Sequence, residues 1–265
     1  MFTVITVIMV MISLMVHEFG HGWAMTRHQI PIKEAGIGFG RKWIPHFWFE
    51  WRGVPIKVTP LILGGYVMPA EESEKLIENA SYKVKAEIFG AGVLGNILFF
   101  YVMQVLAIII HPEWGFDWIY LGLPFWAITS IVAVMLLFRR FCFEWLFIMI
   151  GLAQLGFLVY ALFIHNPFEV MAGPVGVVNL AVVHPADDWT VTMADVFSRA
   201  GLISLLIGLT NMLPLFPLDG GRIMAALFHR FNWNRVKNFY TVISSLAMLG
   251  LIILALTSDV VKLLR

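Results

Sequence analysis

Long apolar runs, separated by shorter polar stretches, dominate this sequence. A run of on the order of 20 predominantly apolar residues is long enough to cross the hydrocarbon core of a bilayer as a helix. Such runs occur at about residues 2–25, 88–110, 118–138, 144–164, 200–218 and 239–256. The pattern therefore predicts an all-α polytopic membrane protein with about six transmembrane helices, folded as a single membrane-embedded domain over residues 1–265.

One stretch departs from the helical pattern. Residues 47–67, FWFEWRGVPIKVTPLILGGYV, have the composition of strands, with Arg52-Gly53 as the expected hairpin turn. We therefore expect a membrane-associated β-hairpin after the first helix. It either dips into the membrane edge, where protein or water satisfies its backbone, or lies at the interface with its tryptophans among the headgroups. The polar stretch from Glu71 to Lys85 predicts a surface helix that leads into the second span.

Composition excludes the soluble classes. Hydrophobic residues make up 60% of the chain and charged residues 13%, whereas soluble domains carry about 25% charged residues. No basic stripe is present, so we expect no nucleic-acid partner. A single cysteine, Cys142, excludes an intrachain disulfide. The first apolar run lacks a basic n-region and is interpreted as a retained spanning helix.

The basic residues lie mostly on one side of the predicted topology. All but three of the 18 Lys and Arg residues fall in the connections that follow the first, third and fifth spans; the exceptions are Arg199, Lys262 and Arg265. Basic connections face the cytoplasm in membrane proteins. The asymmetry predicts cytoplasmic basic connections and both termini on the opposite side.

The strongest chemical signal is the segment HEFGH, residues 17–21. His17 and His21 are spaced i, i+4 and share one helical face, so their imidazoles can bind one zinc ion while Glu18 acts as a general base. The segment lies inside an apolar helix, where an ionisable side chain costs on the order of 2.5–3.5 kcal/mol. Metal binding would offset that cost. The alternative is a helix end at which these side chains simply meet water.

Asp219 is the best candidate for a third ligand. It follows the fifth span in NMLPLFPLDGG, where two prolines must interrupt the helix. Irregular backbone at membrane depth usually lines a cavity. The first and fifth spans run in the same direction, so their polar ends meet at the same depth. Taken alone, Asp219 is better interpreted as a helix-ending turn residue before Gly220-Gly221, and the histidines are what favour the ligand role.

Together, HEFGH and NMLPLFPLDGGR resemble the motifs of the site-2 protease family of intramembrane zinc metalloproteases. Three further segments are similar to family motifs: LGGYVMPAEE at 63–72, GVLGN at 92–96 and AGPVGVVN at 172–179. The chain looks like a compact form of the family, without a PDZ-type module or a regulatory C-terminal domain.

The resemblance implies hydrolysis of a peptide bond within or near the transmembrane segment of a membrane-protein substrate in the lipid bilayer. Because water must reach the site, we expect the active site to lie toward the basic, polar cytoplasmic side. The resemblance implies one zinc ion per chain, bound by His17, His21 and Asp219, with Glu18 as catalytic base. It also suggests that Asn96, Asn211, Gly64 and Gly65 lie near the oxyanion or the bound substrate strand. A buried asparagine can instead bridge helices, because it must find hydrogen-bond partners.

Two other functions fit parts of the pattern. A transporter could line its path with intramembrane histidines and an aspartate, but transporters often show internal repeats, and none is visible in this sequence. A catalytically inactive relative could bind membrane proteins without cutting them, although the intact Glu18 argues against this alternative.

Overall fold

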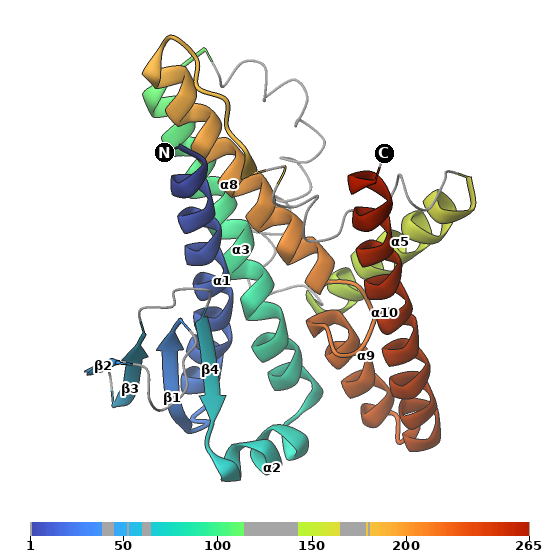
Figure 1. Cartoon of the computed structure of the whole chain (residues 1–265). Helices are drawn as coiled ribbons and strands as arrows, with labels where there is room; N and C mark the ends of the chain where they lie inside the picture. Colours follow the sequence, from blue (N-terminus) through green and yellow to red (C-terminus); the bar gives the residue numbers. More distant parts are fainter. Residues whose placement is uncertain are drawn as a thin grey trace.

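The computed structural model (Figure 1) describes residues 2–38, 45–51, 53–59, 65–113, 143–164, 179 and 181–264. Its helices are α1 (Phe2–Arg27), α2 (Glu71–Asn79), α3 (Tyr82–Ile110), α5 (Phe143–Ile164), α8 (Trp189–Asn211), α9 (Asp219–Arg230) and α10 (Asn234–Leu263). Its strands are β1 (Ile32–Ile37), β2 (Phe47–Trp51), β3 (Val54–Val58) and β4 (Gly65–Pro69).

Four of the described helices, α1, α3, α8 and α10, are long and apolar enough to cross a membrane. They correspond to the first, second, fifth and sixth predicted spans. The fourth predicted span coincides with α5, which contributes a shorter apolar stretch, Met149–Tyr160. The third, at 118–138, lies outside the described residues, so the count of six stays a prediction.

The fifth span differs from its predicted bounds. Helix α8 begins at Trp189, where the side chain of Asp188 accepts a hydrogen bond from the Thr190 amide, and it ends at Asn211 instead of Leu218. Polar residues such as Thr192 and Ser198 lower the hydropathy of the first half of this helix, so the sequence did not predict it as part of the span. Both residues are nevertheless buried. The helix ends early because Pro214 and Pro217 cannot continue it.

Helices α1, α3 and α8 lie side by side (Figure 1), and α1 and α3 carry the HEFGH and GVLGN segments. Helices α1 and α3 approach closely because glycines face the partner backbone. A Cβ atom on Gly20 would lie 2.4 Å from the carbonyl oxygen of Ala91, and one on Gly95 would lie 2.8 Å from that of Val16. Small residues of this kind let helix backbones meet in membranes.

The apolar core extends from α3 through α8 to α9, and includes Val93, Ile97, Leu205 and Ile223. Helix α10 packs against α9 but exposes large apolar side chains along most of its length, among them Phe239, Val242, Leu246, Leu249 and Ile253. Continuous exposed apolar surface of this extent is typical of contact with another apolar phase. The chain is therefore an integral membrane protein.

A four-stranded sheet of order β2-β3-β1-β4 lies beside α1 (Figure 1). Strands β2 and β3 pair antiparallel, with Trp51 opposite Val54, so the chain reverses at the expected position and Gly53 has a positive φ of 79°. The sequence did not predict β1, which pairs parallel to β3 and antiparallel to β4. The fold is thus mostly helical with a small sheet, and the placement of the β2-β3 pair relative to lipid stays a prediction.

The glycine contact between α1 and α3 can be tested with Gly20→Ala. We expect a loss of about 1–3 kcal/mol of stability, because the new methyl group meets backbone atoms that cannot rotate away. Gly250→Ala in α10 is the matched control, since nothing lies within 4 Å of its added Cβ, and it should gain roughly 0.5–1 kcal/mol from helix propensity. Thermal unfolding in detergent, followed by tryptophan fluorescence, measures both. Equal melting temperatures for the two variants would contradict the close contact.

Candidate metal centre

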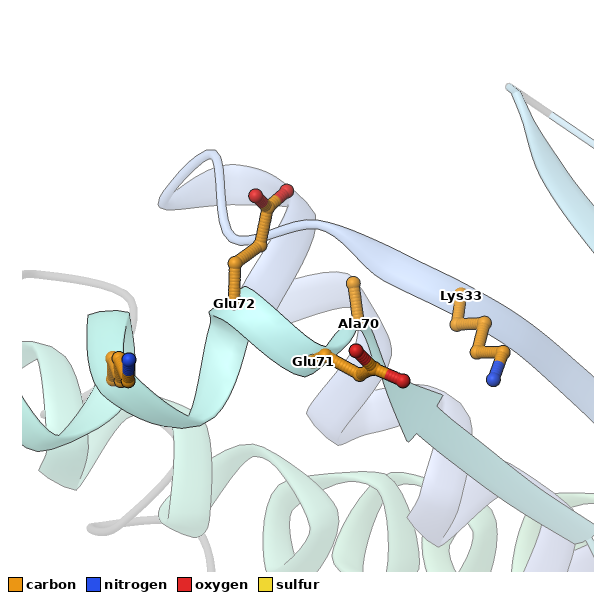
Figure 2. A pocket seen from close by; sticks show the side chains of 5 residues that line it. Lys33, Ala70, Glu71 and Glu72 are labelled. Atoms are coloured by element: carbon orange, nitrogen blue, oxygen red, sulfur yellow. The ribbon is translucent and has the colours of Figure 1, made fainter.

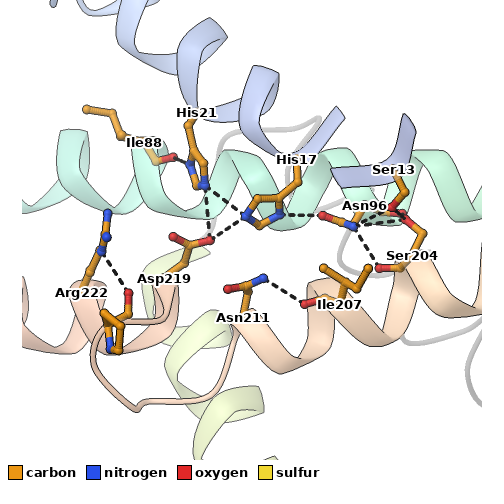
Figure 3. Close-up of polar contacts among 11 residues, drawn as sticks. Ser13, His17, His21, Ile88, Asn96, Ser204, Ile207, Asn211, Asp219 and Arg222 are labelled. Atoms are coloured by element: carbon orange, nitrogen blue, oxygen red, sulfur yellow. Dashed lines mark hydrogen bonds and ion pairs between the residues drawn. The ribbon is translucent and has the colours of Figure 1, made fainter. Parts of the chain in front are cut away.

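Three potential ligand atoms meet between α1 and the start of α9 (Figure 3). The Nε2 atoms of His17 and His21 lie 3.2 Å apart, and Oδ2 of Asp219 lies 3.2 Å from the first and 3.4 Å from the second. His17 and Asp219 are buried, and the side chain of His21 is 15% exposed. Residues some 200 positions apart in the chain thus converge on one point inside apolar helices.

The loop between α8 and α9 places Asp219 at this point. Its irregular backbone finds partners on α10: the Tyr240 hydroxyl donates to the Pro214 carbonyl at 2.9 Å, and the Phe216 amide donates to Ser244 Oγ at 3.3 Å. Non-helical backbone in a membrane protein needs such internal partners. Asp219 is the first residue of α9, where the helix dipole favours a negative charge.

Gly92 on α3 provides the space for both imidazoles. A Cβ atom at this position would lie 2.5 Å from Nε2 of His21 and 2.8 Å from Cε1 of His17. Both rings therefore pack directly on the α3 backbone. The GVLGN segment thus supplies clearance for the histidines through its first glycine, a role that its sequence alone did not reveal.

The second nitrogen of each ring is held by an acceptor. Nδ1 of His17 lies 2.6 Å from the amide oxygen of Asn96, and Nδ1 of His21 lies 2.7 Å from the carbonyl oxygen of Ile88. Because both partners only accept, each Nδ1 carries the proton and donates it. A neutral imidazole has one N–H, so both Nε2 atoms present lone pairs to each other and to Asp219.

This arrangement fits a zinc ion. Three lone-pair atoms at 3.2–3.4 Å repel one another unless a cation lies among them, and buried Oδ2 of Asp219 has no hydrogen-bond donor. Zinc binds such nitrogen and oxygen ligands at about 2.0–2.2 Å in tetrahedral sites, which places two ligand atoms about 3.3 Å apart. The separations match that value, and the Nδ1 partners are those expected around metal-bound histidines.

Glu18 follows His17 on α1 and is half-buried. Adjacent residues of a helix point in different directions, and Glu18 is not among the three residues whose ligand atoms converge. The role of Glu18 as catalytic base stays a prediction.

The four residues predicted for oxyanion or substrate contacts lie in different surroundings. Asn96 is fully buried and bonds to α1 and α8, as a helix-bridging asparagine does. Asn211 is half-buried at the end of α8, donates to the Ile207 carbonyl at 3.1 Å, and turns its amide oxygen toward the side of Asp219 (Figure 3). Gly65 begins β4 and packs on Met15 of α1, and Gly64 lies outside the described residues.

Two serines near the centre were not predicted. Ser13 and Ser204 are fully buried, and their hydroxyls lie 2.7 Å apart beside Asn96 (Figure 3). Ser13 precedes His17 by four residues, so it shares the helical face of both histidines. That spacing is the sequence signal that points to Ser13, whereas nothing in the sequence singles out Ser204.

A separate hollow of about 560 Å³ lies beside β1 and the start of α2 (Figure 2). It is lined by Lys33, Ala70, Glu71, Glu72 and Lys75. None of these residues belongs to the predicted site. Its charged lining is typical of a solvated surface and does not indicate a second metal centre.

Comparisons with known proteins agree with these motifs. The model of peptidase family M50 matches residues 5–255. The chain is 29% identical over 104 residues to the regulator of sigma E protease of Haemophilus influenzae, and 30% identical over 110 residues to the protease RseP of Yersinia pestis. These matches cover 35% and 37% of this chain, but only 23% and 24% of the relatives' own lengths.

Metal analysis of the purified protein tests the ligand set. We expect about one bound zinc ion per chain in the wild type and much less bound zinc in Asp219→Ala. The variant keeps only two of the three protein ligands, which is too few to hold zinc tightly. His28→Ala is the matched control: His28 also lies near α1 and pairs with a carboxylate, Glu87, at 2.7 Å. Unchanged zinc in Asp219→Ala, or equal loss in both variants, would contradict the assignment.

Proposed function

Because this chain belongs to peptidase family M50, the site-2 protease family, we propose that it is an intramembrane zinc metalloprotease that cleaves a peptide bond within or near a substrate's transmembrane segment. The membership confirms the resemblance carried by HEFGH and NMLPLFPLDGGR. The single observation that supports the activity most directly is the convergence of His17 and His21, on the candidate membrane-spanning helix α1, with Asp219 at the start of α9.

In the proposed reaction, the metal and the side chains of the protein have separate roles. His17, His21 and Asp219 would hold a zinc ion, which supplies Lewis-acid chemistry by activating water and polarising a peptide carbonyl. Glu18 accepts a proton from the attacking water and delivers it to the leaving amine. A C–O bond forms as the C–N bond breaks, so the products are a new carboxylate and a new amine. The apolar helices around the centre exclude bulk water from the reacting groups.

A helical substrate must unwind before it can react, since a helix hides its backbone carbonyls in hydrogen bonds. Strand β4 offers a surface for the unwound segment: it lies at the edge of the described sheet, pairs there only with β1, and packs against α1. Gly65 of β4 meets Met15, two residues before His17. An edge strand can bind an extended peptide by strand addition, and here it would guide the peptide toward the histidines.

The centre is proposed to face the cytoplasm. The C-terminal end of α1, the sheet, α2, the first turn of α3, the last turn of α9 and the first turn of α10 carry most of the described Lys and Arg residues, and such residues favour the cytoplasmic side. His21 lies near the C-terminal end of α1, and Asp219 follows the C-terminal end of α8. Water and released products would therefore pass on the cytoplasmic side, with both termini opposite.

The alternative functions fit less well. Membership of a peptidase family does not favour a transporter. A catalytically inactive relative would keep the same metal centre and differ only in lacking cleavage, so an activity measurement separates it from the protease.

Glu18→Gln tests the general base. We expect zinc content to stay at the wild-type level while cleavage falls by roughly 10²–10⁴-fold, because the amide cannot accept the water's proton. The probe is a single-span model peptide with glycine and proline in its hydrophobic segment and a fluorophore–quencher pair, reconstituted with the enzyme in vesicles. Glu87→Gln is the control for loss of a carboxylate on the same side of the protein. Full cleavage by zinc-loaded Glu18→Gln would exclude the role, and a wild type that cleaves no peptide of a sequence-varied panel would favour the inactive relative.

Orientation can be tested with an exposed position on α2. In a Cys142→Ser background, Glu74→Cys places one thiol on an exposed face of α2. We expect a membrane-impermeant maleimide to label it in inside-out vesicles and not in intact cells, because the basic side faces the cytoplasm. Labelling in intact cells would reverse the proposed orientation.

A further inference from the structure

We propose that Asn96 is a positioning residue that fixes the tautomer and the ring orientation of His17, and so presents an unprotonated Nε2 to the metal. This inference rests on the proposed zinc site. It assigns Asn96 to the support of a ligand, away from the oxyanion and the substrate strand. The observation behind it is a buried hydrogen-bond network that joins α1, α3 and α8 at this side chain (Figure 3).

The orientation of the Asn96 amide is determined by a main-chain group. Its Nδ2 atom donates to the carbonyl oxygen of Ser204 at 3.0 Å. A carbonyl oxygen only accepts, so the reversed amide would place two acceptors in contact inside the protein. The nitrogen therefore faces α8, and the amide oxygen must face His17 on α1.

The two serine hydroxyls complete the network. Ser204 Oγ donates to the main-chain carbonyl of Asn96 at 3.1 Å, and Ser13 Oγ donates to Ser204 Oγ at 2.7 Å. Both hydroxyl oxygens are also within reach of Asn96 Nδ2, at 3.1 and 3.2 Å. Every polar group in this fully buried cluster has a partner. Such a network holds one arrangement, because any rotation would leave a buried group unsatisfied.

The fixed amide dictates the state of His17. Its oxygen lies 2.6 Å from Nδ1 of the imidazole, so the proton must reside on Nδ1 and the lone pair on Nε2. The other tautomer would set lone pairs of oxygen and nitrogen against each other and would point an N–H at the metal. Partners of this kind orient metal-binding histidines, and their loss weakens metal affinity by about 10–100-fold.

A second buried amide side chain that links α3 to α8, that of Gln104, provides a matched control. Gln104 is also buried on α3, and it also spans to α8: its Nε2 donates to the Ser198 carbonyl at 3.2 Å, and the Ser198 hydroxyl donates to its Oε1 at 3.5 Å. Among the described residues, neither Gln104 nor Ser198 forms a hydrogen bond with His17 or His21. Gln104→Leu therefore removes the same type of bridge between the same helices without touching a ligand.

The experiment compares four full-length variants purified in detergent: Asn96→Leu, Asn96→Asp, Gln104→Leu and His17→Ala. Zinc affinity is measured by competition with a chromophoric chelator, and stability by thermal unfolding of the metal-free protein. We expect Asn96→Leu to weaken zinc binding by about 10–100-fold, and Gln104→Leu to lower the melting temperature while leaving zinc affinity near the wild-type value. In the cobalt-substituted protein, the visible absorption spectrum should change in Asn96→Leu and not in Gln104→Leu.

Asn96→Asp separates positioning from simple packing. Its carboxylate can still accept a hydrogen bond from the N–H at His17 Nδ1, but it cannot donate a hydrogen bond to the Ser204 carbonyl. We expect zinc affinity to be retained while the melting temperature of the metal-free protein falls. This variant carries the test by itself if Asn96→Leu does not fold, because a purely structural role predicts that affinity falls together with stability.

The outcomes distinguish this inference from the proposed function. Loss of zinc in His17→Ala with equal affinities in Asn96→Leu and Gln104→Leu would overturn the positioning role alone, as would parallel losses of affinity and stability in Asn96→Asp. Zinc retained in His17→Ala, or no zinc in a folded wild type, would overturn the metal centre itself and the inference with it.

Discussion

The meeting of three unprotonated ligand atoms inside an apolar helical unit is the interaction on which the rest of the structure depends. Lone pairs at 3.2–3.4 Å do not attract one another, and ionisable groups are costly at membrane depth. A bound cation would attract all three lone pairs, and would so offset both their mutual repulsion and the cost of burying ionisable groups. The requirement then explains the surrounding features: the glycine that makes space for the rings, the acceptors behind them, and the interrupted helix that delivers Asp219.

Interrupting a helix in a membrane creates a second cost, because backbone groups lose their partners. Helix α10 offsets that cost at the loop that precedes Asp219, through Tyr240 and Ser244. The same helix exposes most of its apolar side chains. Its two faces therefore differ: one exposes apolar side chains, and the other holds the loop that leads to Asp219. Helix α10 is in this way part of the support of the candidate centre.

The sequence predicted that His17, His21 and Asp219 would lie together, because the relevant signals are local. A spacing of i, i+4 places His17 and His21 on one face whatever the rest of the chain does, and prolines interrupt a helix wherever they occur. The contacts of Asn96 depend instead on how α3 is rotated against α1 and α8, which no local pattern specifies. Strand β1 was missed for the same reason: its partners, β3 and β4, are non-local. The polar first half of α8 was missed because its buried Thr192 and Ser198 resemble loop residues until their partners are known.

The three ligands are supported by different kinds of group, and this difference has a consequence for how the centre can change. His21 is held by the main-chain carbonyl of Ile88, which no substitution removes, and Asp219 is held by a loop with several attachments to α10. Only His17 depends on a side chain, Asn96, for the partner of its second nitrogen. Substitution at that one position can therefore alter the ligand properties of a single histidine while the other two ligands stay in place. The Asn96 amide is neutral, so it orients the His17 ring without adding a negative charge. The centre already contains the carboxylate of Asp219, and Glu18 is next to His17 in the chain. A carboxylate there would make His17 a stronger donor but would place a third acidic group in an apolar site, and the amide avoids that cost.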